Sequence, residues 1–262
     1  MSNYSFTYME NADITKYDFS LHNHDEYEIY MYLGGDTHYV VEGKSYSLEP
    51  NDIIIIRRGE MHRPYHKSNT PYSRIVLMVN PEYFKENNCA GYEKQFLDTS
   101  GSIGNKIDAR IVKSSGILDA FERLRKYSDG FKNYETPVCK AIVTEILYII
   151  DNISEFSSDD IPNEHIRKAI KYINSNFTRD ISIEDISNYC YTSKYYLCRI
   201  FKESTGLNIH DFITKKRIQH IRDLNADGMN LTNAVLNSGF NNYSNFYRSY
   251  VKLTGQSPKN LN

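Results

Sequence analysis

The sequence predicts an α+β protein in which a small antiparallel β-barrel comes first, helices follow, and an all-α module ends the chain. Three observations predict this class. Residues 21–59 contain short segments rich in Tyr, Ile and Val that are separated by turn residues, as in hairpins. After Pro81 the apolar residues recur at helical steps. The 262 residues are enough for about two domains.

The net charge of the chain changes from negative to positive at the start of the all-α module. It is −2 for the whole chain. Residues 1–163 carry 17 Lys and Arg against 25 Asp and Glu, a net charge of −8, and residues 164–262 carry 14 against 8, a net charge of +6. An acidic body joined to a basic module indicates that the second part binds a polyanion.

Cysteine usage and hydrophobicity exclude several classes of protein. Cys89, Cys139, Cys190 and Cys198 are widely spaced with no CxxC pair, so neither a thiolate zinc site nor a disulfide framework is indicated. Residues 1–13 lack the features of a signal peptide, and no apolar stretch approaches the ~20 residues that span a bilayer. We therefore expect a cytoplasmic protein with no membrane partner.

The barrel strands are predicted between turns at positions 34–35, 42–44 and 50–52. The run Ile53–Ile56 is apolar on both faces, as expected for a strand covered on both sides, and another strand is predicted around Ser73–Val79.

Two helices are predicted next, Gly116–Tyr127 and Thr136–Ile153. The second carries one apolar stripe, made of Val138, Ile142, Ile146, Ile149 and Ile153. The stripe packs either on its own barrel or on the same helix of a second subunit, and we expect a homodimer through this helix. The division is then a barrel at 1–80, a helical dimerisation and coupling region at 81–156, a linker at 157–163 within the polar stretch 154–163, and a helical module at 164–262.

The basic module contains a weak internal repeat. Arg199 and Gly206 recur 49 residues later as Arg248 and Gly255, and Leu197 corresponds to Phe246. Residues before the turn of each copy are related by a shift of 48 instead. The turn of the second copy is therefore one residue longer than that of the first.

The sequence of each copy of the repeat predicts a helix, a tight turn and a second helix. Ser182 caps a helix that ends near Cys190, and Ser193 caps one that ends near Ser204. In the second copy, Leu231–Ser238 is the first helix, Gly239-Phe240 is the turn, and Asn242 caps a helix that ends near Leu253.

The outer face of each second helix suits a major groove, which admits one helix and lets arginine bind guanine through two hydrogen bonds. The predicted DNA-binding residues are Ser193, Lys194, Tyr195, Tyr196, Cys198, Arg199, Asn242, Tyr243, Ser244, Asn245, Tyr247 and Arg248. Lys215, Lys216 and Arg217, between the copies, are candidates for phosphate contacts. The alternative is an ordinary helical bundle with a solvated basic face.

Residues 181–202 followed by Gly206 resemble the first half of the AraC/XylS family DNA-binding domain. Gly239-Phe240, residues 244–248 and the Gly-Gln-Ser-Pro sequence at 255–258 resemble its second half. The resemblance implies seven helices. One of them, Ile209–Asn225, would position the two recognition helices one DNA turn apart on the same side of the duplex.

Three histidines and a glutamate in the barrel form a second pattern. His22, His24 and Glu28 have the same parity on a strand, so they point to one face, and His62 follows the strand Ile53–Ile56. This pattern resembles the metal signature of cupins. Regulators of the AraC/XylS family commonly keep a cupin-like barrel that binds a small organic effector without metal.

The AraC/XylS resemblance implies an effector site and makes a sugar the leading class of ligand, whose hydroxyl groups suit polar side chains inside a small barrel. Its predicted residues are His22, His24, Glu28, Tyr30 and His62. No cofactor is expected. One alternative is a divalent metal held by the three histidines and Glu28, and another is a purely structural role.

The predicted function is a cytoplasmic transcription regulator, not an enzyme, in which the effector controls promoter occupancy as an activator or repressor. The expected partners are double-stranded DNA, the effector, a second copy of the chain and RNA polymerase. The alternative is a metal-dependent cupin enzyme with an accessory helical module.

Overall fold

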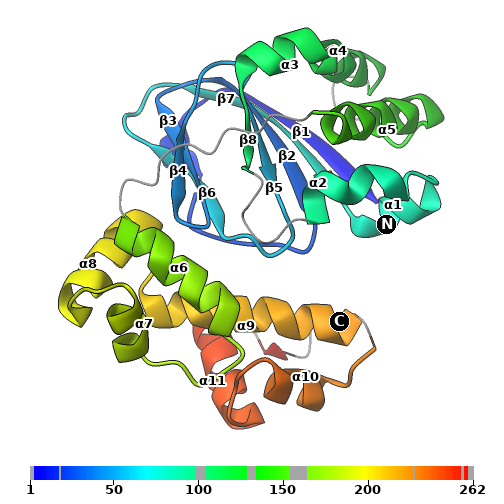
Figure 1. The fold of residues 1–262 in the computed structure, drawn as a ribbon. Coiled ribbons are helices and arrows are strands. Elements are labelled where there is room, and N and C mark those ends of the chain that lie inside the picture. The colour runs from blue at the N-terminus through cyan, green and yellow to red at the C-terminus, as the bar shows by residue number, and fades with distance from the viewer. Residues whose placement is uncertain are drawn as a thin grey trace. The chain divides into compact units, whose positions relative to one another are not determined.

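The structure is a computed structural model that describes residues 3–17, 19–97, 104–128, 134–153, 164–226, 228–254 and 257–258. The chain forms two compact units, Met1–Asp160 and Ile161–Asn262. The first contains strands and helices, and every regular element described in the second is a helix (Figure 1). The predicted α+β class is confirmed. Among the described helices, none combines the length and the apolar character needed to cross a membrane.

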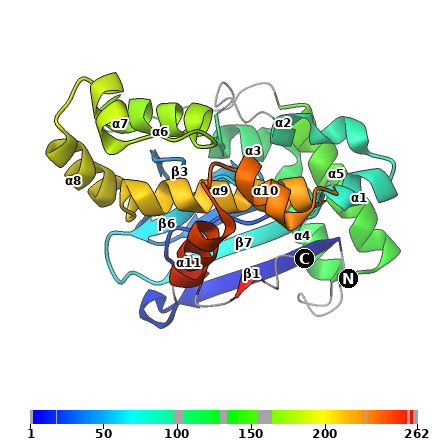
Figure 2. The ribbon, with the colours of Figure 1, turned by 90° about the horizontal axis from the view of Figure 1, so that it is seen from below.

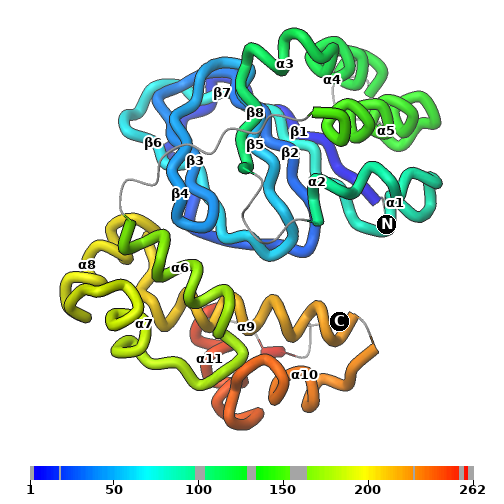
Figure 3. Tube along the Cα trace, viewed as in Figure 1, coloured from blue at the N-terminus to red at the C-terminus, as the bar shows by residue number. Residues whose placement is uncertain are grey.

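The N-terminal unit contains two antiparallel sheets, one with strand order β1-β7-β2-β5-β8 and one with order β4-β3-β6. They face each other in Figures 1 and 3. The strands are β1 (Tyr4–Ala12), β2 (Tyr27–Gly34), β3 (Thr37–Val41), β4 (Lys44–Ser47), β5 (Ile53–Ile56), β6 (His62–His66), β7 (Tyr72–Val79) and β8 (Lys106–Ile107). The strands predicted within 21–59 and around 73–79 are confirmed, whereas β1, β6 and β8 were not predicted.

The central strands β2 and β5 are buried on both faces because successive side chains of a strand point to opposite sides. On β2, Ile29 and Met31 enter a core shared with the helices. Tyr30 and Tyr32 enter the core between the two sheets. The four isoleucines of β5 alternate in the same way, so the prediction that this strand is covered on both sides is confirmed.

Helices cover the outer face of the five-stranded sheet (Figure 1). They are α1 (Pro81–Glu86), α2 (Lys94–Leu97), α3 (Ala109–Ser115), α4 (Ile117–Tyr127) and α5 (Pro137–Asp151), with a short 3-10 helix at Ala90–Glu93. A second 3-10 helix, Ile14–Lys16, places Ile14 against the core between the two sheets. Strand β8 lies between α2 and α3 in the sequence and pairs with β5. The boundary at 80/81 therefore does not separate two compact units, because strands and helices share one core.

The apolar stripe of α5 packs on its own domain. Ile142, Ile146 and Ile153 are buried in the core of the N-terminal unit. Ile149 packs against the same core, so four of the five stripe residues are not available to a second subunit and only Val138 remains exposed. The expectation of a dimer through these four side chains is corrected. Two large apolar side chains of α5 lie outside this core, because Val138 is 52% exposed and Tyr148 is 50% exposed. The predicted linker at 157–163 lies outside the described residues.

The long helix α9 organises the C-terminal unit. It contacts α8 of the first helix pair and both helices of the second pair, and Figures 1 and 2 show it between the two groups. The helices are α6 (Glu164–Asn176), α7 (Ile183–Tyr189), α8 (Lys194–Thr205), α9 (Ile209–Ala226), α10 (Leu231–Asn237) and α11 (Tyr243–Thr254). The described residues thus contain six of the seven helices that the AraC/XylS resemblance implies.

The internal repeat is confirmed residue by residue. Helix α11 begins and ends 49 residues after α8, and α10 begins and ends 48 residues after α7. The predicted caps are also present. Ser182 forms a reciprocal capping box with Asp185, and Asn242 Oδ1 accepts a hydrogen bond from the backbone N–H of Asn245 at 2.8 Å.

Candidate nucleic-acid interface and ligand cavity

Helix α8 separates an apolar face from a polar, aromatic face. Leu197, Ile200 and Phe201 are buried in the C-terminal unit. The predicted DNA-binding residues of this copy lie on the other side. Ser193, Lys194, Tyr195, Tyr196 and Arg199 are exposed, and Cys198 is partly buried. Tyr195 has 80% of its surface exposed and Tyr196 has 38%.

Helix α11 repeats this division. Phe246 and Tyr250 are buried in a core with α9 and α10. Of the predicted DNA-binding residues in this copy, Asn242, Tyr243, Ser244, Tyr247 and Arg248 are exposed and Asn245 is partly buried. Both copies therefore present an arginine five residues after the start of their second helix.

Local contacts hold the two arginines above their helices. The Arg199 guanidinium lies 5.5 Å from the ring centroid of Tyr196, in cation–π geometry. A terminal nitrogen of Arg248 donates a hydrogen bond to Oδ1 of Asn245 at 2.6 Å. On the first copy, Lys194 Nζ donates to Glu184 at 2.7 Å, which raises the pKa of Lys194. The side chains are thus partly ordered before any partner binds.

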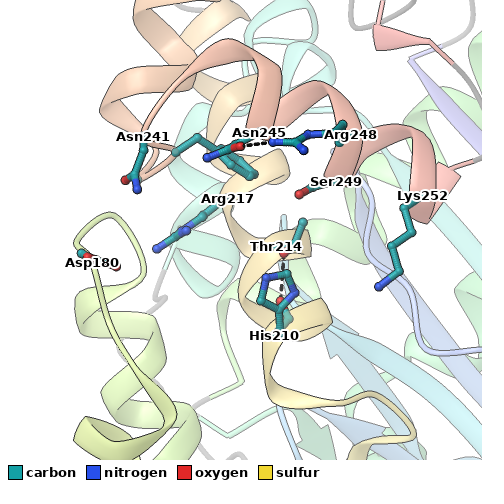
Figure 4. Close-up of a pocket in the computed structure, with 11 residues that line it drawn as sticks. Asp180, His210, Thr214, Arg217, Asn241, Asn245, Arg248, Ser249 and Lys252 are labelled. Atoms are coloured by element: carbon teal, nitrogen blue, oxygen red, sulfur yellow. Dashed lines mark hydrogen bonds between the residues drawn. The ribbon is translucent and has the colours of Figure 1, made fainter.

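A cavity of about 410 Å³ lies beside α11 (Figure 4). Arg248 and Lys252 of α11 line it, together with His210 and Arg217 of α9 and with Asp180 from the loop after α6. Most of these side chains are basic, which suits a phosphate group. Sequence reasoning missed Lys252, although its i+4 spacing from Arg248 places it on the same face of the helix.

Arg217 makes structural contacts that the sequence did not reveal, and its predicted contact with phosphate remains a prediction. Its Nε donates to the carbonyl oxygen of Phe177 at 2.7 Å, and a terminal nitrogen donates to the carbonyl oxygen of Arg179 at 2.7 Å. The guanidinium also lies 5.6 Å from the ring centroid of Phe240. Burial lowers the pKa of Arg217. The side chain ties the end of the first helical group to the turn of the second.

A second cavity, of about 380 Å³, lies in the N-terminal unit and is lined by strands of both sheets. Four of the five predicted effector-binding residues line it: His22, His24, Glu28 and Tyr30. The fifth, His62, is buried behind Glu28, with its Nε2 3.3 Å from Oε2 of Glu28. Tyr39 also lines the cavity.

The polar end of this cavity is a network around Glu28. Nε2 of His24 lies 3.0 Å from Oε2 of Glu28, and the Tyr39 hydroxyl donates to Oε1 at 3.3 Å. Burial would raise the pKa of Glu28, but the contacts with His24 and His62 outweigh it and lower the pKa. Burial would lower the pKa of His62, but Glu28 raises it. The pKa of His22 is lowered by desolvation and by His62.

The other end of the cavity carries groups that sequence reasoning missed. The Tyr72 hydroxyl is hydrogen-bonded to that of Tyr30 at 2.7 Å, and burial raises the pKa of both phenols, which stay neutral. Arg74 lines the cavity, and its buried Nε has no hydrogen-bond partner among the described residues. No sequence motif marks Arg74 as a cavity residue, because only the fold directs its side chain into the cavity.

Comparison with known proteins assigns both units. Residues 7–124 match the AraC-like ligand binding domain, and residues 186–262 match a helix-turn-helix domain. An uncharacterized HTH-type transcriptional regulator of Staphylococcus aureus (strain COL) is 21% identical over 232 residues, which are 87% of this chain. The chain spans only 30% of the length of that relative. YdeC, an uncharacterized HTH-type regulator of Bacillus subtilis (strain 168), is 20% identical over 95% of this chain and 87% of its own length.

Solved structures align either with nearly the whole chain or with little more than a third of it. ToxT from Vibrio cholerae O395 aligns over 98% of this chain and 95% of its own, with 14% identity and a TM-score of 0.37. A probable AraC family transcriptional regulator from Rhodopseudomonas palustris CGA009 aligns over 38% of this chain and 94% of its own, with 29% identity and a TM-score of 0.34. With a ligand-binding domain at residues 7–124 and a helix-turn-helix domain at residues 186–262, the chain belongs to the AraC-type transcriptional regulators.

Proposed function

We propose that this protein reads a specific DNA sequence with α8 and α11 and that a small molecule in the N-terminal cavity controls its occupancy of a promoter. The observation that carries the proposal is the repeat. Two helices related by 49 residues present Arg199 and Arg248 at equivalent exposed positions. Two such helices, about 34 Å apart along the duplex, suit successive major grooves.

The DNA-reading role is tested with a duplex selected by the wild-type protein from random sequence. Arg199→Ala and Arg248→Ala should each weaken specific binding by about 1–3 kcal/mol, measured by fluorescence anisotropy. Lys171→Ala, which removes an exposed cation of α6, is the matched control and should leave specificity unchanged. Unchanged affinity in the double arginine variant rejects the proposed role.

The effector is proposed to be a small hydroxylated molecule, with sugars and sugar acids as the leading classes. Neutral phenols, imidazoles and a carboxylate suit hydroxyl groups, and the unpartnered Nε of Arg74 favours a ligand that also carries a carboxylate. The effector acts only if it binds two states of the protein with different affinity.

A thermal-shift screen with matched pairs of sugars and sugar acids tests the effector class. A ligand that binds the folded state raises the melting temperature. Arg74→Met should abolish the response to an acid while retaining the response to a neutral sugar.

The assembly is proposed to be a homodimer, with RNA polymerase as a further partner at the promoter. The exposed side of α5, which includes Val138 and Tyr148, is the surface we propose for the contact between subunits. Because the proposed target is bacterial chromosomal DNA, we place the action of the protein in the cytoplasm.

A further inference from the structure

The three histidines at the polar end of the N-terminal cavity share one feature that the sequence does not reveal. Each places its Nδ1 against a backbone carbonyl oxygen: His22 against Ser20 at 2.9 Å, His24 against Glu26 at 2.9 Å, and His62 against Glu60 at 2.8 Å. A carbonyl oxygen only accepts hydrogen bonds, so each Nδ1 carries a proton. In the neutral ring, the lone pair is then on Nε2.

These lone pairs meet at one place. One ring nitrogen of each histidine lies within 4.8 Å of the other two. Oε2 of Glu28 lies 3.0 Å from Nε2 of His24 and 3.3 Å from Nε2 of His62. Two nitrogen lone pairs that face a carboxylate oxygen at these distances repel it unless a cation lies between them. That cation is either a proton or a metal ion.

A proton satisfies only part of this cluster. One proton on Nε2 of His24 makes the hydrogen bond to Glu28. His62 Nε2 lies 3.3 Å from the same carboxylate oxygen but is buried and forms no hydrogen bond in the described part of the chain. Buried polar atoms are rarely left in that state, so an orphaned imidazole nitrogen beside a carboxylate indicates a missing ligand.

We propose that His22, His24, His62 and Glu28 bind one divalent transition-metal ion. Three imidazoles and one carboxylate suit Zn²⁺, Fe²⁺, Mn²⁺, Co²⁺ or Ni²⁺. A histidine that binds a metal almost always donates its other ring N–H to a carbonyl or carboxylate, and all three histidines do so here. Ligand atoms about 2.1 Å from a common metal lie at most about 4.2 Å apart, so the cluster needs only a small contraction.

The metal retains an open coordination position toward the cavity. Four protein ligands leave one or two positions of a five- or six-coordinate ion unfilled. His22, His24 and Glu28 all line the cavity of about 380 Å³, so an unfilled position faces that space. An oxygen-donor anion is the class of ligand that would complete the coordination. This last step rests on the proposed function, because it places the metal at the effector site.

Metal binding is measured directly on the full-length chain after dialysis against a chelator. Calorimetric titration with Co²⁺ and Zn²⁺ should give one ion per wild-type chain, and Co²⁺ should give visible d–d absorption. His22→Ala and His24→Ala should each weaken binding by at least about tenfold. His22 is exposed, so its replacement leaves the core intact. His38→Ala, a barrel histidine outside the cluster, should bind like wild type.

Azide serves as the probe for the open position and should change the Co²⁺ spectrum of the wild-type protein. Stoichiometric binding that survives in both His22→Ala and His24→Ala, or no binding by wild type, overturns the inference. Anisotropy with the selected DNA separates the two proposals. DNA binding without metal binding refutes the metal site alone, and metal binding without specific DNA binding refutes the proposed function alone.

Discussion

Gly239 and Phe177 approach each other so closely that a β-carbon on Gly239 would lie 2.7 Å from the carbonyl oxygen of Phe177. The same oxygen accepts the hydrogen bond from Arg217. Gly239 also has a φ of +88°, in the left-handed region that favours glycine. The turn of the second copy therefore rests directly on the segment that follows α6, and the two helix pairs are joined there as well as through α9.

Gly239→Ala should destabilise the C-terminal unit more than the same change at Gly228. Both glycines have positive φ, and a left-handed alanine costs about 1–2 kcal/mol. Only at Gly239 does the added carbon overlap other atoms, which adds about 1–3 kcal/mol. Gly228 has nothing within 4 Å of the added carbon. Urea unfolding of both variants measures the difference, and equal losses would contradict the steric contact.

Tyr191→Gly should stabilise the protein by up to about 1 kcal/mol. Tyr191 occupies the position equivalent to Gly239 in the first copy, and its φ of 53° is unfavourable for a residue with a β-carbon. Its side chain is 86% exposed and contacts Lys168 in cation–π geometry. Tyr191→Ala removes the same ring but keeps the strain. A higher melting temperature for Tyr191→Ala than for Tyr191→Gly would refute the strain argument.

Arg217→Ala should lower stability rather than the number of phosphate contacts. Its loss removes hydrogen bonds from a charged group to two carbonyl oxygens, each contributing about 1.5–3 kcal/mol. The slope of log affinity for DNA against log salt concentration should stay at its wild-type value. Lys216→Ala is the comparison and should reduce that slope by about 1 if Lys216 contacts phosphate. A reduced slope in Arg217→Ala would instead support the predicted phosphate contact.

Acid should weaken the start of α7. The pKa of Asp185 is lowered by hydrogen bonds from the side chain and backbone N–H of Ser182. A carboxyl whose folded-state pKa is depressed stabilises the protein above its unfolded-state pKa, and this contribution is lost as pH falls through the folded-state value. The stability difference between wild type and Asp185→Asn should therefore be largest near neutral pH and shrink below about pH 4. A difference independent of pH would exclude this capping box.

Substituting the exposed side of α5 should dissociate the proposed dimer. Val138→Glu combined with Tyr148→Glu places two charges on apolar surface, which should shift the sedimentation equilibrium toward the monomer. Leu97→Glu is the control, because Leu97 is 61% exposed on α2 and lies outside the proposed contact. A wild-type protein that is already monomeric at micromolar concentration counts against the dimer, and dissociation by Leu97→Glu counts against this surface.

The helices of the C-terminal unit were predictable because their signals are local. Ser182, Ser193 and Asn242 cap helices within one turn of themselves, and the apolar faces follow the helical period. Strands β1, β6 and β8 were missed because their stability depends on distant partners, such as β3 for β6. Strand β1 pairs with β7 over a separation of 60 residues or more, and β8 is only two residues long.

The strand parity predicted for His22, His24 and Glu28 was wrong, because β2 begins only at Tyr27 and both histidines precede it. The sequence by itself determined the repeat and the charge division. Those properties depend on spacing along one chain, which a linear pattern preserves. Only the tertiary structure decided that Arg217 serves as a tether, that most of the α5 stripe is internal, and that Arg74 faces the N-terminal cavity. The tertiary structure also decided the carbonyl contacts that orient the three histidines. Each contact depends on where a loop places its backbone, and loop paths are fixed by packing rather than by local preference.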